Sequence, residues 1–235
     1  MKNSVSVFHY DSLDSTQEEA ARLVEKGVEA PFLVVSREQT AGRGRLGRTF
    51  YSPKDTGLYM TAVLPLPAVS GVAVTCLTAV RVVKALEKVG APKLWIKWVN
   101  DLMLQDRKIA GILTEKKSGK LFVGIGINLS VKEFPEEIRE KAGNLAENGR
   151  LSREDAEKLS AAVGEALLSL GSIPGNDSEL QFYRERSYLT GKKVHCLPLD
   201  VTGIVTGIDD FGGLVLETKD GEKVITSGEV TVRTV

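Results

Sequence analysis

The chain has 235 residues, of which 42% are hydrophobic and 26% are charged, a composition typical of a soluble globular protein with its own core. Its 31 basic and 31 acidic side chains cancel, so there is no global field to hold nucleic acid or an anionic membrane, and any basic site must be local. Neither an apolar signal region nor a run of ~18 apolar residues is present, and we therefore expect a cytoplasmic protein.

Helical and extended patterns alternate along the first half of the chain. Capping and acidic residues at Ser15 precede a periodic apolar stretch that ends at Gly27, which predicts a short helix. Compact apolar runs at 32–36 and 57–66 predict buried strands, and apolar residues at helical spacing over 71–90 predict a long amphipathic helix. Turn residues then separate β-type runs that predict a meander, at residues 94–98, 101–105, 108–116 and 120–131.

The second half of the chain predicts a further long helix over residues 152–170, with Ser152 in a capping position. The segment 173–177 has the composition of a linker, and a short helix is expected around 180–189. After Thr190 the sequence consists of five short β runs with frequent glycines, which indicates a small barrel-like module. We therefore predict two domains, 1–188 and 189–235.

The segment GRGRLGR, residues 42–48, is a local cationic and pliable loop between two predicted strands. It matches the G-x-G-x-x-G fingerprint of dinucleotide-binding proteins, but a strand follows instead of the helix that this motif requires. A protein-kinase reading, suggested also by Asp210-Phe211-Gly212, fails because the kinase lysine and catalytic loop are absent from the sequence. We interpret the loop as a lid for an anionic small molecule, with a nucleic-acid patch as the weaker alternative.

Polar residues and glycines in the predicted meander indicate a site. Lys97 lies among bulky apolar residues, either as a surface lysine or as a cation that faces the same pocket as the arginine loop. Asn100-Asp101 fit a turn and a polar site equally well. Gly124 and Gly126 leave one face of a strand without side chains, which suits either a ligand or a closely packed helix.

The two cysteines, Cys76 and Cys196, lie 120 positions apart in apolar contexts without metal-binding spacing. Both are predicted to be buried small side chains, and a catalytic thiol at Cys76 is the less favoured alternative.

Five motifs in this order resemble the biotin protein ligase family, the biotin–[acetyl-CoA-carboxylase] ligases: DSTQ (14–17), EQTAGRGRLGR (38–48), KWVND (97–101), RKIAGIL (107–113) and GIGIN (124–128). The similarity runs from about residue 8 to residue 131, and the β module after residue 190 resembles the C-terminal SH3-like domain of the family. The resemblance implies an α+β fold of the class II aminoacyl-tRNA synthetase and biotin ligase type. In this fold a mixed central β-sheet is flanked by helices and followed by a small SH3-like β-barrel.

The resemblance also implies a reaction in two steps. Biotin and ATP, with Mg²⁺, form biotinyl-5′-AMP and pyrophosphate, and a lysine of a biotin carboxyl carrier protein domain then displaces AMP. A carboxylate that attacks a triphosphate needs cationic groups to offset the repulsion, and the reactive intermediate needs a lid against water. The arginine loop and Lys97 suit both needs.

Site residues carry over motif by motif. The resemblance implies that the biotin head group binds Ser15, Thr16, Gln17 and Gln39, and that biotin and its acyl phosphate are covered by Arg43, Gly44 and Arg45. The ring and tail of biotin would lie on Gly111, Gly124 and Gly126. The nucleotide would meet Arg45, Arg48 and Asn128. Lys97, together with Arg45, would be the catalytic residue that holds the carboxylate and the α-phosphate.

Three positions depart from the family pattern: Val99 replaces a usual proline, Phe50 stands near a common tryptophan, and Gln17 replaces a more frequent asparagine. Lipoate or octanoate ligases and acyltransferases are the nearest alternative, and a non-enzymatic nucleic-acid binder is a distant one. The chain starts its catalytic pattern at once, so we expect no helix-turn-helix domain and no DNA partner. A homodimer is compatible with the family, but the sequence does not fix an interface.

Overall fold

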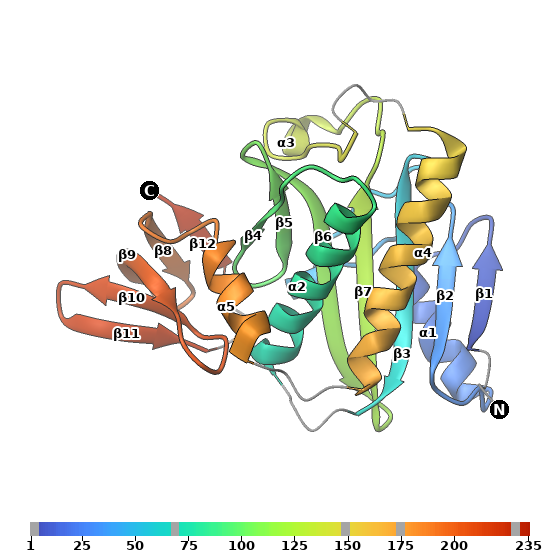
Figure 1. Ribbon diagram of the computed structural model, residues 1–235, viewed down its shortest axis with the longest axis horizontal. Helices are drawn as coiled ribbons and strands as arrows, with labels where there is room; N and C mark the ends of the chain where they lie inside the picture. The colour runs from blue at the N-terminus through green and yellow to red at the C-terminus, as the bar shows by residue number, and fades with distance from the viewer. Residues whose placement is uncertain (1–4, 67–70, 147–150, 173–176, 227–230) are drawn as a thin grey trace.

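The computed structural model describes residues 5–66, 71–146, 151–172, 177–226 and 231–235, and it contains two β-sheets (Figure 1). The larger sheet has seven strands in the order β1-β2-β3-β7-β6-β5-β4, in which β1 and β2 are parallel and the other neighbours are antiparallel. Its strands are β1 (Ser6–Tyr10), β2 (Phe32–Ser36), β3 (Gly57–Pro65), β4 (Trp95–Lys97), β5 (Asp101–Leu104), β6 (Arg107–Lys117) and β7 (Lys120–Asn128).

The smaller sheet is antiparallel, with its five strands in the order β11-β10-β9-β8-β12. These strands are β8 (Lys193–Leu197), β9 (Val201–Ile208), β10 (Leu214–Thr218), β11 (Gly221–Ile225) and β12 (Thr231–Thr234). The five β runs predicted after Thr190 are therefore confirmed as strands. The division of the chain at residues 188 and 189 stays a prediction.

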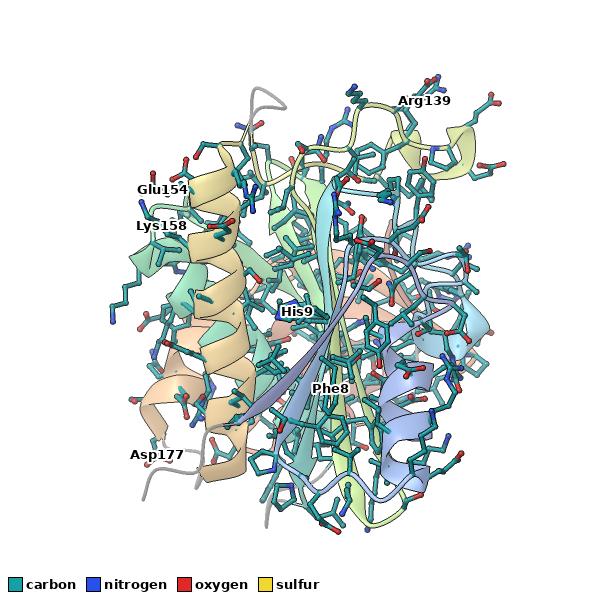
Figure 2. The ribbon with its side chains drawn as sticks, turned by 90° about the vertical axis from the view of Figure 1, so that its right-hand side faces the viewer. Phe8, His9, Arg139, Glu154, Lys158 and Asp177 are labelled. Carbon is teal, nitrogen blue, oxygen red and sulfur yellow. The ribbon has the colours of Figure 1, made fainter. Side chains whose placement is uncertain are left out.

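Helices cover both faces of the large sheet. Figure 2 shows α1 on one side of the sheet and α4, which carries the labelled Glu154 and Lys158, on the other. The helices are α1 (Thr16–Glu25), α2 (Val72–Lys88), α3 (Glu136–Arg139), α4 (Arg153–Ser169) and α5 (Asp177–Glu185), with short 3₁₀ turns at Arg45–Gly47 and Leu170–Ser172. Ser15 and Ser152 cap α1 and α4, because each hydroxyl accepts a hydrogen bond from a backbone N–H of the first turn, as predicted.

Two hydrophobic layers hold the large sheet between its helices. Alternate residues of β3 point to opposite faces, so Met60, Ala62 and Leu64 join the main core with α2 and α4. Val63 joins a second cluster under α1, where the rings of Phe8, labelled in Figure 2, and Phe32 meet edge to face with centroids 5.7 Å apart. The α1 face of the sheet is therefore the face on which Tyr59 and Thr61 also lie.

The small sheet packs against the large one through a turn between β9 and β10. The carbonyl oxygen of Gly212 in this turn accepts a hydrogen bond of 2.9 Å from Trp98 Nε1 and lies 3.8 Å from the thiol of Cys76 on α2. Arg184 of α5 donates a hydrogen bond of 2.8 Å to the carbonyl oxygen of Ile208. Buried side chains of both sheets belong to one continuous hydrophobic cluster.

Most predicted elements are confirmed, including the meander β4-β5-β6-β7 and the helices over 15–27, 71–90 and 152–170 within two or three residues. The sequence analysis missed β1 and α3, and it placed no 3₁₀ turn inside GRGRLGR. Residues 173–176 of the predicted linker lie outside the described residues. No described helix is both long enough and apolar enough to span a bilayer.

Candidate functional site

One row of residues crosses five neighbouring strands on the α1 face of the large sheet. The cross-strand partners, taken in order from β3 to β4, are Tyr59, Gly126, Gly111, Asp101 and Lys97. The two glycines in the middle have no side chains, so the row forms a bare backbone shelf between an aromatic ring and a pair of charged groups. A flat ligand can approach the backbone of this shelf closely.

One side chain from α1 and one from the segment that follows the arginine loop lie on this shelf in the present structure. A Cβ added to Gly126 would collide with the ring of Phe50, and one added to Gly124 would lie 2.6 Å from Oε1 of Gln17. The sequence left open whether a ligand or a packed helix covers these glycines. In the present structure side chains cover them, and the described atoms nearest to their Cβ positions include no helix backbone. Two movable side chains cover the shelf, and one of them, Gln17, comes from a helix.

A β-bulge brings a second lysine to the shelf. The register of β5 and β6 shifts between Leu102 and Met103, and Lys108 therefore faces the same side as Gly111, three residues further along β6. Nζ of Lys108 forms an ion pair of 2.7 Å with Asp101 Oδ1 and would lie 3.2 Å from a Cβ on Gly111. Lys97, Lys108 and Asp101 therefore form one charged group at the end of the shelf.

The first turn of α1 supplies a buried polar network at the other end. Gln39 Oε1 accepts hydrogen bonds from the backbone N–H of Thr16 at 2.8 Å and from its hydroxyl at 3.1 Å. Thr61 of β3 lies 2.9 Å from the Thr16 hydroxyl and 3.2 Å from Gln17 Oε1, as donor in both contacts. Ser15, Thr16 and Gln17 are all buried. The hydroxyl and amide groups of this network can donate hydrogen bonds to a polar ligand and accept hydrogen bonds from it.

The arginines of GRGRLGR reach toward different parts of the molecule. Arg43 forms an ion pair with Glu18 on α1, whereas Arg48 donates a hydrogen bond of 2.9 Å to the hydroxyl of Thr231 on β12. Leu46, which directly follows the second arginine, has a positive φ of 57°, a conformation that is uncommon outside glycine. The loop is thus tied to α1 on one side and to the small sheet on the other.

Arg45 is the most buried of the three arginines and turns toward the charged end of the shelf. Its Nη1 donates a hydrogen bond of 2.7 Å to Oδ1 of Asn100. Burial lowers the pKa of Arg45 from its usual value, and the negative charge of Asp101 opposes that effect. A guanidinium remains protonated at neutral pH, so Arg45 brings a permanent, partly desolvated charge to this end.

Lys97 also carries a partly desolvated charge. Burial is the main cause that lowers its pKa below 10.5; Asp101 raises it, and the nearby ammonium of Lys108 lowers it further. Cations held in a partly buried site interact more strongly with anions than they would in water. Lys97 and Arg45 can therefore bind a carboxylate or a phosphate group.

Asn128, at the end of β7, carries an unpaired buried acceptor. Its Nδ2 donates to the carbonyl oxygen of Gly143 at 3.0 Å, while its Oδ1 has no hydrogen-bond partner among the described residues. An unsatisfied buried acceptor is costly, and a ligand N–H would satisfy it.

Comparisons of the sequence and of the structure with known proteins both find biotin protein ligases. Residues 10–132 match the sequence profile of the Biotin/lipoate A/B protein ligase family, and residues 198–233 match that of the Biotin protein ligase C terminal domain. The Bifunctional ligase/repressor BirA of Bacillus subtilis is 31% identical over 253 residues, which cover 95% of this chain and 73% of that protein.

The chain belongs to the biotin/lipoate A/B protein ligase family.

Solved members of this family have the same fold. The biotin protein ligase from Aquifex aeolicus in complex with biotin and ATP superposes with a TM-score of 0.83 at 32% identity, over 98% of this chain and 99% of that one. The Biotin--[acetyl-CoA-carboxylase] ligase of Mycobacterium tuberculosis is 29% identical over 84% of this chain and 77% of its own length. The predicted mixed sheet with flanking helices is thus confirmed.

The structure brings most of the family-derived residues to one face of the sheet. Residues on the shelf, at the first turn of α1 or hydrogen-bonded to that turn are Ser15, Thr16, Gln17, Gln39, Lys97, Gly111, Gly124 and Gly126, and those that border the shelf are Arg43, Arg45 and Asn128. Gly44 contacts Arg48 within the loop. Arg48 differs, because its described contact is with the small sheet.

Other groups at the site were missed from the sequence. Thr61 was hidden in an apolar strand, Lys108 reaches the shelf only through the bulge, and Asp101 was left undecided between a turn and a site. Thr61 can be recognised as a site residue only from the register of β3 against β7, which pairs it with Gly124.

Cys76 has no place in this site. The thiol is buried on α2, and burial raises its pKa to about 12. A nucleophilic cysteine needs a lowered pKa and access to solvent. The alternative of a cysteine-dependent acyltransferase is therefore not supported by the environment of Cys76.

Proposed function

We propose that this protein is a biotin protein ligase, which forms biotinyl-5′-AMP from biotin and ATP and transfers biotin to a lysine of a biotin carboxyl carrier protein domain. The observation that carries the proposal is the glycine shelf, with a polar network at one end and, at the other, the partly buried cations of Lys97 and Arg45, both of which are influenced by the charge of Asp101. Family membership and the likeness to ligases crystallised with biotin and ATP support the same chemistry.

Biotin fits the two ends of the shelf in one orientation. Its cyclic urea has two N–H donors and a carbonyl acceptor, which match the mixed donors and acceptors of Thr16, Gln17 and Gln39. Its tail would run over the backbone of Gly124 and Gly126 after the ring of Phe50 moves aside. The carboxylate would then arrive at Lys97.

In the first step an oxygen of the biotin carboxylate forms a bond to the α-phosphorus of ATP. The bond from that phosphorus to the bridging oxygen breaks, and pyrophosphate leaves. Lys97 and Arg45 would offset the repulsion between the two anions, and Asn128 Oδ1 would accept a hydrogen bond from the amino group of adenine. Arg48 would reach the phosphates only after it leaves Thr231.

Mg²⁺ would bind together with the ATP phosphates and neutralise part of their charge. The described residues contain no cluster of three or more His, Cys, Asp or Glu side chains arranged for a metal. Lys97 and Arg45 face the same end of the shelf, where they would act on the phosphate charge beside the ion.

In the second step the amine of the carrier lysine attacks the carbonyl carbon of biotinyl-5′-AMP. The new C–N bond forms, the C–O bond to AMP breaks, and the amine loses a proton. Before that attack the mixed anhydride must be shielded from water, and the loop that holds Arg43 and Arg45 would cover it; the contacts of these arginines with Glu18 and Asn100 support this role.

A direct test is to incubate the protein with biotin, ATP, Mg²⁺ and a biotin carboxyl carrier domain and to measure the mass of the carrier. We expect the carrier to gain one biotinyl group, and only when all components are present. No mass gain, together with no heat of biotin binding by calorimetry, would contradict the proposal. Lipoate and octanoate in place of biotin test the other branch, which the polar network disfavours because these acyl groups lack a urea.

A further inference from the structure

The Gln17 side chain lies on the shelf in a defined orientation. Its Oε1 lies 2.6 Å from the position that a Cβ on Gly124 would take, and 3.2 Å from the hydroxyl of Thr61. Its Nε2 points the other way and donates a hydrogen bond of 2.8 Å to Oε2 of Glu115 on β6. The amide therefore presents its oxygen to the glycine strip.

Glu115 fixes this orientation by its chemistry. An ionised carboxylate only accepts hydrogen bonds, so the nitrogen of the Gln17 amide must face it, and the oxygen must face away. Glu115 itself is the cross-strand partner of Phe122, four pairs further along the sheet from the pair of Gly111 and Gly126. It does not belong to the charged group around Lys97.

Packing alone does not hold Gln17. A cavity of about 230 Å³ lies behind it, between α1 and the end of the β6-β7 hairpin, and is lined by Gln17, Glu18, Ala21, Arg43, Glu115, Lys116, Lys117 and Phe122. Glutamine also has one more rotatable bond than the asparagine that is more frequent here in the family, so more conformational freedom must be removed to hold its amide in place.

We propose that Glu115 is a positioning residue for biotin, which acts by locking Gln17 with its acceptor oxygen toward the N–H groups of the biotin ring. This inference rests on the proposed function. Without the carboxylate, the amide can turn over within nearly the same shape and present its N–H groups to the N–H groups of the ring. The affinity for biotin would then fall, while the rate of adenylate formation at Lys97 would stay the same.

The test is the conservative variant Glu115→Gln, which keeps the shape of the side chain but can face Gln17 with either oxygen or nitrogen. In a pyrophosphate-release assay we expect the KM for biotin to rise about tenfold, which is the effect of one misplaced buried hydrogen bond, and kcat to change less than twofold. The control is the same change at Glu25, an exposed residue at the end of α1 outside the cavity, and Glu25→Gln should alter neither value.

A double-mutant cycle separates positioning from a structural role. Because Glu115 acts through Gln17, adding Glu115→Gln to Gln17→Ala should not weaken biotin binding further, as measured by calorimetry. A further tenfold loss in the double variant, an unchanged KM in Glu115→Gln, or a fall in its melting temperature beyond a few degrees would each overturn the inference. The wild-type protein is measured first, because a wild type that binds no biotin refutes the proposed function instead.

Discussion

At the scale of single residues, the site holds cations where burial makes them costly. Burial lowers the pKa of Lys97 below 10.5, so the folded chain binds this proton less tightly than the unfolded chain does. Between the lowered pKa and 10.5 the unfolded state carries more protons, and stability therefore rises with pH across that window. At neutral pH the charged ammonium opposes folding.

Lys97→Met should therefore raise the melting temperature at pH 7 and abolish formation of biotinyl-5′-AMP. Asp101 keeps Lys108 as its ion-pair partner in this variant, so no buried carboxylate is left alone. Differential scanning calorimetry and pyrophosphate release measure the two effects. Lys117→Met, at an exposed position, serves as the control and should change neither. A lower melting temperature for Lys97→Met would show that its charge stabilises the fold.

Arg45→Gly should release the intermediate. The variant loses the hydrogen bond to Asn100 and the partly buried charge that, by the proposed function, would lie beside the acyl phosphate, so biotinyl-5′-AMP should dissociate at least tenfold faster. Escape is measured by chromatography of the free adenylate and by biotin on lysines of an added unrelated protein. Arg37→Gly, which removes a surface ion pair with Asp55, should retain the intermediate like the wild type. An Arg45→Gly enzyme that does not leak would refute the retaining role.

At the scale of elements, the shelf depends on the absence of two side chains at paired positions of β6 and β7. Gly126→Ala puts a methyl group where the ring of Phe50 now lies, and this ring, which is only partly buried, has to turn away from the strand. We expect a stability loss of about 1 kcal/mol or less but a loss of biotin affinity of tenfold or more.

Calorimetric titration with biotin and thermal unfolding measure these two effects of Gly126→Ala. Gly171→Ala is the matched control, because its new Cβ meets only Leu64 at an ordinary distance of 3.7 Å. Biotin affinity equal to that of the wild type in Gly126→Ala would mean that biotin does not lie on this part of the sheet.

The sequence predicted most helices and strands, but it did not predict how the strands pair in register. Helical periodicity and caps predicted α1, α2 and α4, because those signals are local. The row from Tyr59 to Lys97 depends on strand pairing and on a bulge that turns Lys108 to the side of Gly111, against the simple alternation of a strand. Arg48 and Thr231 are 183 positions apart, and no local pattern predicts their contact. The edge strand β1 was missed because most of its residues are exposed.

At the scale of the whole molecule, the small sheet supports the residue next to Lys97. Trp98 donates its indole N–H to Gly212, which has a positive φ of 84° and whose Cβ position would lie 3.1 Å from the sulfur of Cys76. Gly212→Ala should cost about 1–3 kcal/mol, because alanine is strained at this φ. For a chain of this size each kcal/mol lowers the melting temperature by roughly 2–4 °C.

Thermal unfolding checks this prediction, with Gly207→Ala on β9 as the control, because a Cβ there meets no atom within 4 Å. We also expect Gly212→Ala to lower kcat for pyrophosphate release, since the shift of Trp98 disturbs the neighbouring Lys97. A Gly212→Ala protein with wild-type stability and kcat would show that the two sheets act independently.

The continuous hydrophobic cluster has a consequence for synthesis in the cell. It includes Ile96 and Leu102 beside the site and also Val194, Leu214 and Val232 near the end of the chain. A nascent chain cannot bury the first pair fully until residues up to Val232 have emerged from the ribosome, so the core beside the site closes only after the small sheet has been made. We therefore expect activity to appear only when both sheets have been made, and not when the large sheet alone has left the ribosome.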